Sequence, residues 1–303
     1  MINANWIKSG NNLNAPLFEK SFNIKAKIKK AALKISARGC YEAFLNGERL
    51  FDDYLAPGWT VYEKRIQFKE IDLTDKIKES NTLSAQLTSG WYLGRIAGVD
   101  PNQWLTVNPV IYDREAGIIA SLTLQYENGE TEEIKSDDSW LVFEGKIKSC
   151  DIYDGIIYDG TAEKKAFGNA KICENNDKSM LVPETGVKTK AQERIKPVKI
   201  IKTPKRETVV DFGQNFTGIP EIKLTAKKGD RVSLSFGEII GPDGNFYNGN
   251  YRTAKCRYEY ICKDGENIWH PTLTFYGFRY IRIDEFPSEV LLEISKESFF
   301  TAI

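Results

Sequence analysis

Apolar and polar residues alternate with a period of two along much of this chain, which is the pattern of half-buried strands and not of helices. Apolar side chains stand between lysines in Phe22–Ile28, and Leu33–Ile35 and Tyr41–Leu45 repeat the alternation. Such a segment turns one face toward a core and the other toward water. Asn46-Gly47 and Asn128-Gly129 are typical of two-residue hairpin turns. We therefore expect antiparallel strands in the first half of the chain.

The second half resumes the alternation after a polar stretch, near Glu163–Lys196, that has neither the strand nor the helix period. The strands expected there are Thr208–Phe212, Glu221–Ala226, Arg231–Phe236, Cys256–Cys262 and Phe278–Ile283. Short strands separated by turn residues indicate sandwiches or barrels. We expect an all-β chain with two tandem antiparallel β-sandwich domains of the jelly-roll type, residues 1–165 and 197–303, joined by a connection at 166–196.

Composition excludes several classes of protein. Forty-two Lys and Arg residues balance 42 Asp and Glu residues, so a nucleic-acid partner is not expected. No apolar run is long enough for a membrane-spanning helix. Met1–Gly10 lacks the apolar core of a signal peptide, which predicts a cytoplasmic location. The single histidine, His270, and five cysteines without a CxxC pair argue against multi-histidine metal sites, structural zinc and a disulfide framework.

Seven motifs follow one another in an order that is specific, although each motif alone is weak. They are Ala37–Gly47, Leu55–Thr60, Thr88–Arg95, Cys150–Gly155, Asp211–Asn215, Pro242–Gly244, and Phe275–Tyr280 after His270-Pro271. In this order they resemble the N-terminal β-domains of bacterial α-L-rhamnosidases, glycoside hydrolase family 78, over about Trp6 to Ile303. The resemblance implies a bacterial source.

The resemblance also implies a division of labour between domains. The first domain would be similar to a rhamnose-binding carbohydrate module, for which calcium is implicated in some members, and the second would be another small β-sandwich. Hydrolysis would belong to a helical (α/α) barrel that carries an acid and a base carboxylate. No segment here matches that barrel, so no catalytic residue is assigned. The sequence departs from the family pattern at Ile156, at Thr161-Ala162 and in the loop Ile96–Asp113.

Two loops have the composition that sugar binding requires. The apolar face of a sugar packs on an aromatic ring, and its hydroxyls need hydrogen-bond donors and acceptors. The expected contacts are Trp59, Tyr62, Trp91, Tyr92, Trp104, Asn102 and Asn108. Oxygen ligands for a calcium ion would come from Asp52, Asp53 and Asp100. The alternative is structural: a packed corner at Trp59, core positions for Trp91 and Tyr92, and solvated turns at the acids.

We therefore expect a non-catalytic, accessory carbohydrate-binding region whose partners are rhamnose-containing oligosaccharides or glycosides. One alternative is a structural scaffold. Another is a split-enzyme subunit that pairs with a separate catalytic barrel, for which Ser298–Ile303 would be a donated edge strand. The third is an α-L-rhamnosidase in its own right, which would need two carboxyl groups facing each other across one cleft.

Overall fold

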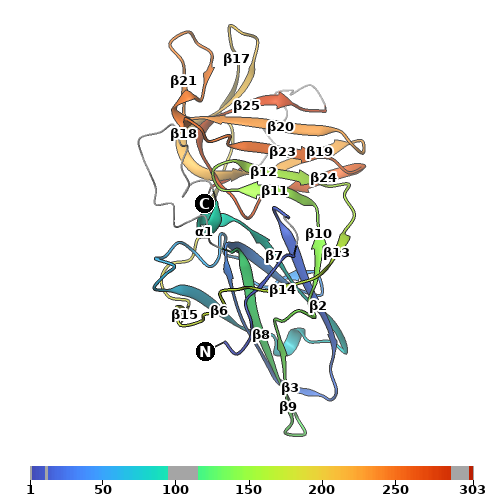
Figure 1. Cartoon of the computed structure of the whole chain (residues 1–303). Coiled ribbons are helices and arrows are strands. Elements are labelled where there is room, and N and C mark those ends of the chain that lie inside the picture. Colours follow the sequence, from blue (N-terminus) through green and yellow to red (C-terminus); the bar gives the residue numbers. More distant parts are fainter. Residues whose placement is uncertain (1, 11–12, 95–114, 288–299, 303) are drawn as a thin grey trace. The chain divides into compact units, whose positions relative to one another are not determined.

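The computed structural model describes residues 2–10, 13–94, 115–287 and 300–302 (Figure 1). Strands make up 53% of the structure and helices 4%, so the expected all-β class with antiparallel sheets is confirmed. None of the helices in the described ranges is long and apolar enough to cross a membrane. The chain divides into two compact units: unit 1 is Met1–Gly145 with Lys164–Lys188, and unit 2 is Lys146–Glu163 with Thr189–Ile303.

Unit 1 contains two sheets that contribute to one core. The first has the order β14-β1-β8-β3-β6-β15, with β9 beside β8. Its strands are β1 (Ile7–Lys8), β3 (Ile28–Arg38), β6 (Ile66–Asp72), β8 (Gly117–Tyr126), β9 (Thr131–Lys135), β14 (Lys171–Ile172) and β15 (Leu181–Pro183). The second has the order β13-β10-β2-β7-β4-β5. Its strands are β2 (Pro16–Asn23), β4 (Cys40–Leu45), β5 (Glu48–Arg49), β7 (Ser80–Thr88), β10 (Leu141–Glu144) and β13 (Lys165–Asn169).

The core of unit 1 explains the alternation in its sequence. Leu33 and Ile35 of the first sheet and Tyr41 and Leu83 of the second lie in one cluster of buried side chains. The first sheet is covered on its other face as well, by a second cluster that contains Trp6, Ile66, Phe68 and Ile119. β8 is therefore buried on both faces over its first half, where Gly117–Ala120 are all apolar, and polar residues alternate with apolar ones only from Ser121 on.

The buried guanidinium of Arg38 packs against Trp6 of the second cluster. It lies 4.4 Å from the centroid of the Trp6 ring and donates to the carbonyls of Asn175 and Asp177, at 2.6 and 3.2 Å. The Trp6 indole donates to the same Asp177 carbonyl at 2.9 Å. These contacts attach the segment after β14 to the sheet, because a buried guanidinium must have its donors satisfied.

Unit 2 is built on a sheet with the order β11-β12-β23-β20-β25-β18-β26-β16, with β17 beside β18. Its strands are β11 (Ile147–Asp151), β12 (Gly155–Asp159), β16 (Glu193–Ile195), β17 (Lys199–Lys202), β18 (Thr208–Pro220), β20 (Arg231–Gly237), β23 (Arg257–Ile261), β25 (Tyr276–Glu285) and β26 (Phe300–Ala302). Two small two-stranded sheets complete it. One pairs β19 (Ile222–Ala226) with the distant β24 (Gly265–Trp269), and the other is the hairpin of β21 (Ile239–Ile240) and β22 (Phe246–Tyr247). An aromatic core that includes Phe236 stacked on Tyr276 fills the unit.

Asp211 shapes the centre of the unit 2 sheet. The segment 211–215, which the sequence analysis grouped as one motif, lies inside β18 as an irregularity in the pairing with β25. The buried Asp211 carboxylate accepts two hydrogen bonds from Arg279 of β25, at 2.9 and 3.1 Å, and one from the Gly213 amide at 2.7 Å. Burial opposes ionisation, but the hydrogen bonds from Arg279 and Gly213 and the charges of Arg279 and Lys199 together outweigh it and lower the pKa of Asp211. The motif therefore has a structural role here.

The hairpin of β11 and β12 belongs to unit 2, although it comes before the last segment of unit 1 in the sequence. β12 pairs in parallel with β23, and Figure 1 shows the green hairpin beside the orange strand. The chain consequently passes between the units three times, whereas the sequence analysis placed one connection at 166–196. Alternation shows that a segment is a strand but not which sheet receives it. The segment at 300–302 is likewise not an edge, because β26 pairs with both β18 and β16.

Gly155 permits the parallel pairing of β12. It has a φ of +87°, and a Cβ there would lie 1.9 Å from the backbone oxygen of Arg257. We expect Gly155→Ala to separate β12 from β23 and to destabilise unit 2 by more than the roughly 1–2 kcal/mol that a left-handed alanine costs. Urea unfolding followed by tryptophan fluorescence measures the loss.

The matched control is Gly265→Ala, also in unit 2, where φ is +84° and no atom lies within 4 Å of the added Cβ. It should show the backbone cost alone. Equal destabilisation by the two variants would contradict the role of Gly155.

Candidate functional site

Two segments of unit 1 bring four of the predicted aromatic residues together. Trp59 and Tyr62 come from the loop between β5 and β6, and Trp91 and Tyr92 come from the short helix α1 (Gly90–Leu93) after β7. The Trp59 and Trp91 rings are stacked, with centroids 6.1 Å apart and planes 12° apart. Tyr62 and Tyr92 meet edge to face at 5.2 Å. Residues that the sequence proposed as sugar contacts in two separate loops therefore lie together as two ring pairs, while their contact with a sugar stays a prediction.

The two pairs differ in exposure. Tyr62 and Tyr92 are buried at 7% and 8% exposure, so they form part of the core. Trp59 is 66% exposed, and Trp91 is half-buried. One face of the Trp59 ring lies on Trp91 while the rest of the side chain faces solvent. An exposed flat ring fixed from behind is the form of surface on which a sugar can stack.

Backbone hydrogen bonds hold the Trp59 loop in place. The Gly58 amide donates to the Leu55 carbonyl at 3.0 Å, and the Gln67 side chain donates to the Pro57 carbonyl at 3.2 Å. Thr60 donates through its hydroxyl to the Arg65 carbonyl at 2.5 Å. Since Gln67 lies on β6, the loop that carries Trp59 is attached to the sheet and not only to its own ends.

Gly90 fixes the start of α1 against β4. Its φ is +53°, and a Cβ would lie 2.6 Å from the backbone nitrogen of Cys40. Only glycine allows so close an approach of two backbones. The position of Trp91 is therefore set by the packing of α1 on the second sheet.

The remaining predicted contacts, Trp104, Asn102 and Asn108, and the predicted calcium ligand Asp100 lie outside the described residues. Asp52 is exposed. Asp53 is buried at 3% exposure, and its environment is that of a structural carboxylate.

Lys69 of β6 is the partner of Asp53. Its ammonium lies 2.7 Å from the Asp53 carboxylate and 2.5 Å from the carboxylate of Glu184, which follows β15. Both Lys69 and Asp53 have side chains that are 4% exposed. Arg49 donates to the Asp53 carbonyl at 2.9 Å and to the Glu42 carboxylate at 2.6 Å. We call Asp53, Lys69 and Glu184 the buried ionic bridge.

The buried ionic bridge bears on the calcium prediction. The sequence analysis assigned a calcium ion to Asp53, but the positive charge beside this carboxylate comes from Lys69. The second Asp53 oxygen, Oδ1, is buried and has no hydrogen-bond partner. Across the described ranges no group of three or more His, Cys, Asp or Glu side chains could hold a metal ion. Asp53 therefore fits a lysine-bound carboxylate better than a calcium ligand. Calcium binding that involves Asp100 stays a prediction.

Lys69 and Glu184 were missed by the sequence analysis. No motif in the sequence singles out Lys69, and Glu184 lies in the polar connection, 115 residues further along the chain. Burial opposes ionisation of Glu184, but hydrogen bonds from Lys69 and Lys188 outweigh it and lower the pKa of the carboxyl. A glycosidase general acid needs a raised pKa, so Glu184 is suited to structure and not to acid catalysis.

Comparison with known proteins identifies the family. Residues 26–202 match the α-L-rhamnosidase N-terminal domain, and residues 201–302 match the bacterial α-L-rhamnosidase concanavalin-like domain. The chain belongs to the bacterial α-L-rhamnosidase family. The resemblance drawn from the seven motifs is thereby confirmed.

Individual α-L-rhamnosidases support the assignment. One from Streptomyces avermitilis is 31% identical over 275 residues, which are 87% of this chain and 26% of that protein. Its crystal structure in complex with L-rhamnose matches 96% of this chain with a TM-score of 0.82 and 29% identity, over 28% of the solved chain. The Aspergillus terreus enzyme matches 99% with a TM-score of 0.88 and 27% identity, over 36% of the solved chain. The chain spans 26–30% of the length of its curated relatives.

Removal of Lys69 should be costly. We expect Lys69→Met to destabilise unit 1 by about 3–5 kcal/mol, because it leaves the buried Asp53 carboxylate without its cation and Glu184 with Lys188 alone. Lys34→Met is the matched control, since Lys34 lies 3.7 Å from Glu70 in an exposed pair on the neighbouring strand, and such a pair contributes at most about 1 kcal/mol. Chemical denaturation of both variants makes the comparison, and similar losses would refute the buried ionic bridge.

Acid should weaken the same bridge. The pKa of Glu184 is lower in the folded chain than in the unfolded chain, where it has its ordinary value of 4.5. The ionised carboxylate therefore contributes its full stabilisation above pH 4.5, and this stabilisation is lost as the pH falls through the folded pKa. The difference in unfolding free energy between wild type and Glu184→Gln should therefore shrink below pH 4.5. Urea titrations at several pH values test this, and a difference that is independent of pH would contradict it.

Proposed function

We propose that unit 1 is a non-catalytic carbohydrate-binding region that recognises L-rhamnose in glycans. The observation that supports this most directly is the exposed Trp59 ring stacked on Trp91. Exposure of a large aromatic ring is unfavourable for a chain with no ligand, because the apolar surface stays in water. L-Rhamnose presents C–H groups and a methyl group, which can pack on such a ring.

The chemistry around Trp59 suits a neutral sugar. The turn that follows contains the exposed polar side chains of Glu63, Lys64 and Arg65, which can donate to or accept from hydroxyls. Hydrogen bonds hold the loop in one conformation, so little conformational entropy remains to be lost on binding. The same α-L-rhamnosidase family includes the Streptomyces avermitilis protein that was crystallised with L-rhamnose.

We assign hydrolysis to the helical barrel that the family resemblance implies, whether that barrel is on the same polypeptide or on a separate chain. Inverting and retaining glycosidases both need two carboxyl groups that flank the scissile bond. Near Trp59, Asp53 and Glu184 are both held by Lys69 and are thus engaged in the fold. Unit 2 then acts as a spacer or docking domain.

The test is isothermal titration of the purified chain with L-rhamnose, in calcium and in EDTA, together with release of nitrophenol from an aryl rhamnoside. We expect binding heat without release of nitrophenol. Trp59→Ala should weaken binding roughly 5- to 160-fold, since stacking on an aromatic ring contributes about 1–3 kcal/mol. Tyr247→Ala, at a 45% exposed aromatic of unit 2, is the control and should bind as wild type does.

The other outcomes separate the alternatives. No heat with folded protein would overturn the binding proposal and favour a scaffold or a split-enzyme subunit. Release of nitrophenol that persists through repurification would show a hydrolase. Binding in calcium but not in EDTA would place a metal at the site and direct the next substitutions to Asp52 and Asp100.

A further inference from the structure

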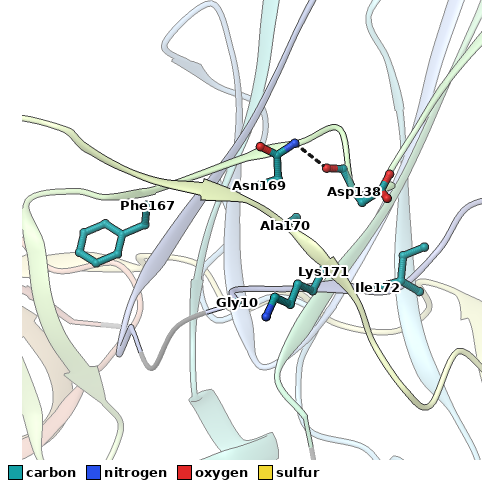
Figure 2. Close-up of a pocket in the computed structure, with 7 residues that line it drawn as sticks. All are labelled: Gly10, Asp138, Phe167, Asn169, Ala170, Lys171 and Ile172. Atoms are coloured by element: carbon teal, nitrogen blue, oxygen red, sulfur yellow. Dashed lines mark hydrogen bonds between the residues drawn. The ribbon is translucent and has the colours of Figure 1, made fainter.

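A continuous groove crosses unit 1 beside the aromatic site. Two cavities of about 650 and 450 Å³ share Gly10 and Lys171 in their linings, so they are parts of one depression. Each volume lies in the range of about 300–1,000 Å³ that is usual for ligand pockets. Figure 2 shows the larger part, with Phe167 at one end of the view, Ile172 at the other, and Lys171 beside Gly10.

Gly10 lies where the two parts of the groove meet. A Cβ there would lie 2.9 Å from Cε of Lys171, so the lysine side chain passes directly over the glycine. Lys171 lies on β14 and is exposed. Among the described residues no carboxylate forms an ion pair with it, and its ammonium is able to donate to a ligand.

The lining mixes apolar and hydrogen-bonding groups. Apolar side chains come from Leu13, Leu87 and Leu93 in the smaller part and from Phe167 and Ile172 in the larger part. Hydroxyl and amide groups come from Thr88, Ser89, Asn14 and Asn169. The Asn169 amide donates to the Asp138 carbonyl at 2.9 Å and so has a fixed orientation.

Charges in the groove balance. Lys8 forms an ion pair with Glu115, and the same carboxylate accepts from the Glu174 amide at 3.0 Å. Lys171 and Asp138 add one charge of each sign. A groove without net charge does not select a polyanion such as nucleic acid or a polyuronate. Apolar patches between hydrogen-bonding groups instead match the alternating faces of neutral sugars.

Helix α1 connects this groove with the aromatic site. Trp91, which stacks on Trp59, and Leu93, which lines the groove, lie two residues apart on that helix. Two positions on a helix are separated by about 200° of rotation, so the two side chains leave α1 on different sides. Helix α1 therefore lies between the aromatic site and the groove, and a glycan that reaches both passes around it.

We propose that the groove binds the further sugars of a neutral oligosaccharide whose terminal rhamnose stacks on Trp59. This inference rests on the proposed function of the aromatic site. It assigns to unit 1 the recognition of a chain of sugars, with Lys171, Asn169 and Phe167 as contacts. The ligand class is a neutral, rhamnose-terminated oligosaccharide.

The experiment compares L-rhamnose with a neutral rhamnose-terminated tetrasaccharide by isothermal titration. Wild type should bind the tetrasaccharide at least tenfold more tightly than the monosaccharide. The double variant Lys171→Ala with Asn169→Ala, at two exposed positions, should lose that advantage and keep its affinity for L-rhamnose. Phe167→Ala should act in the same direction. Lys30→Ala, an exposed lysine of β3, is the control and should change neither affinity.

The outcomes distinguish the groove from the aromatic site. Equal affinity of wild type for the two sugars, or an unchanged tetrasaccharide affinity in both groove variants, would overturn the groove while the Trp59 site stands. Tetrasaccharide binding that depends on Lys171 but not on Trp59 would overturn the proposed aromatic site and, with it, the placement of the terminal rhamnose in this inference. If neither sugar binds, both the aromatic site and the groove are overturned.

Discussion

The ammonium of Lys69 is the point on which the arrangement of unit 1 depends. It joins three segments that are distant in sequence: its own strand β6, the loop that contains Asp53, and the residues after β15 that contain Glu184. A buried lysine is tolerated only when it is paired, and two carboxylates so close together need a cation between them. Each partner is therefore required by the others. The same strand holds Pro57 through Gln67, so β6 fixes the aromatic loop at two places.

The fold class could be predicted from the sequence because alternation is a local property. Leu33 and Ile35 are buried where the period of two predicted it, and the motif order was sufficient to indicate the family. Strand partners could not be predicted in the same way. Ile118 and Ile119 are both fully buried, because β8 has core on each face, and no local pattern shows which sheet receives β12.

The candidate site shows the same limit. Residue type indicated that Trp59, Tyr62, Trp91 and Tyr92 could contact a sugar, and in the structure these residues meet in two ring pairs. Tertiary packing decides which ring faces solvent. Trp59 is exposed and Tyr62 is buried, although the two residues are only three positions apart in the sequence. Asp53 had the chemistry of a metal ligand, but its partner in the structure is Lys69 of β6, a residue that no sequence motif singled out. Charge pairs between distant segments leave no periodic trace in a sequence.

The insertion of β11 and β12 has a consequence for how the chain acquires its structure during synthesis. β12 has its partner β23 about one hundred residues later, and pairings of such high sequence separation form late. The hairpin must remain without its parallel neighbour while the last strand of unit 1 is made and docks on β6. A ribosome-bound chain can thus complete unit 1 while the β11–β12 hairpin of unit 2 is still without its partner strand. We therefore expect the yield of folded protein to depend on translation speed across residues 164–257.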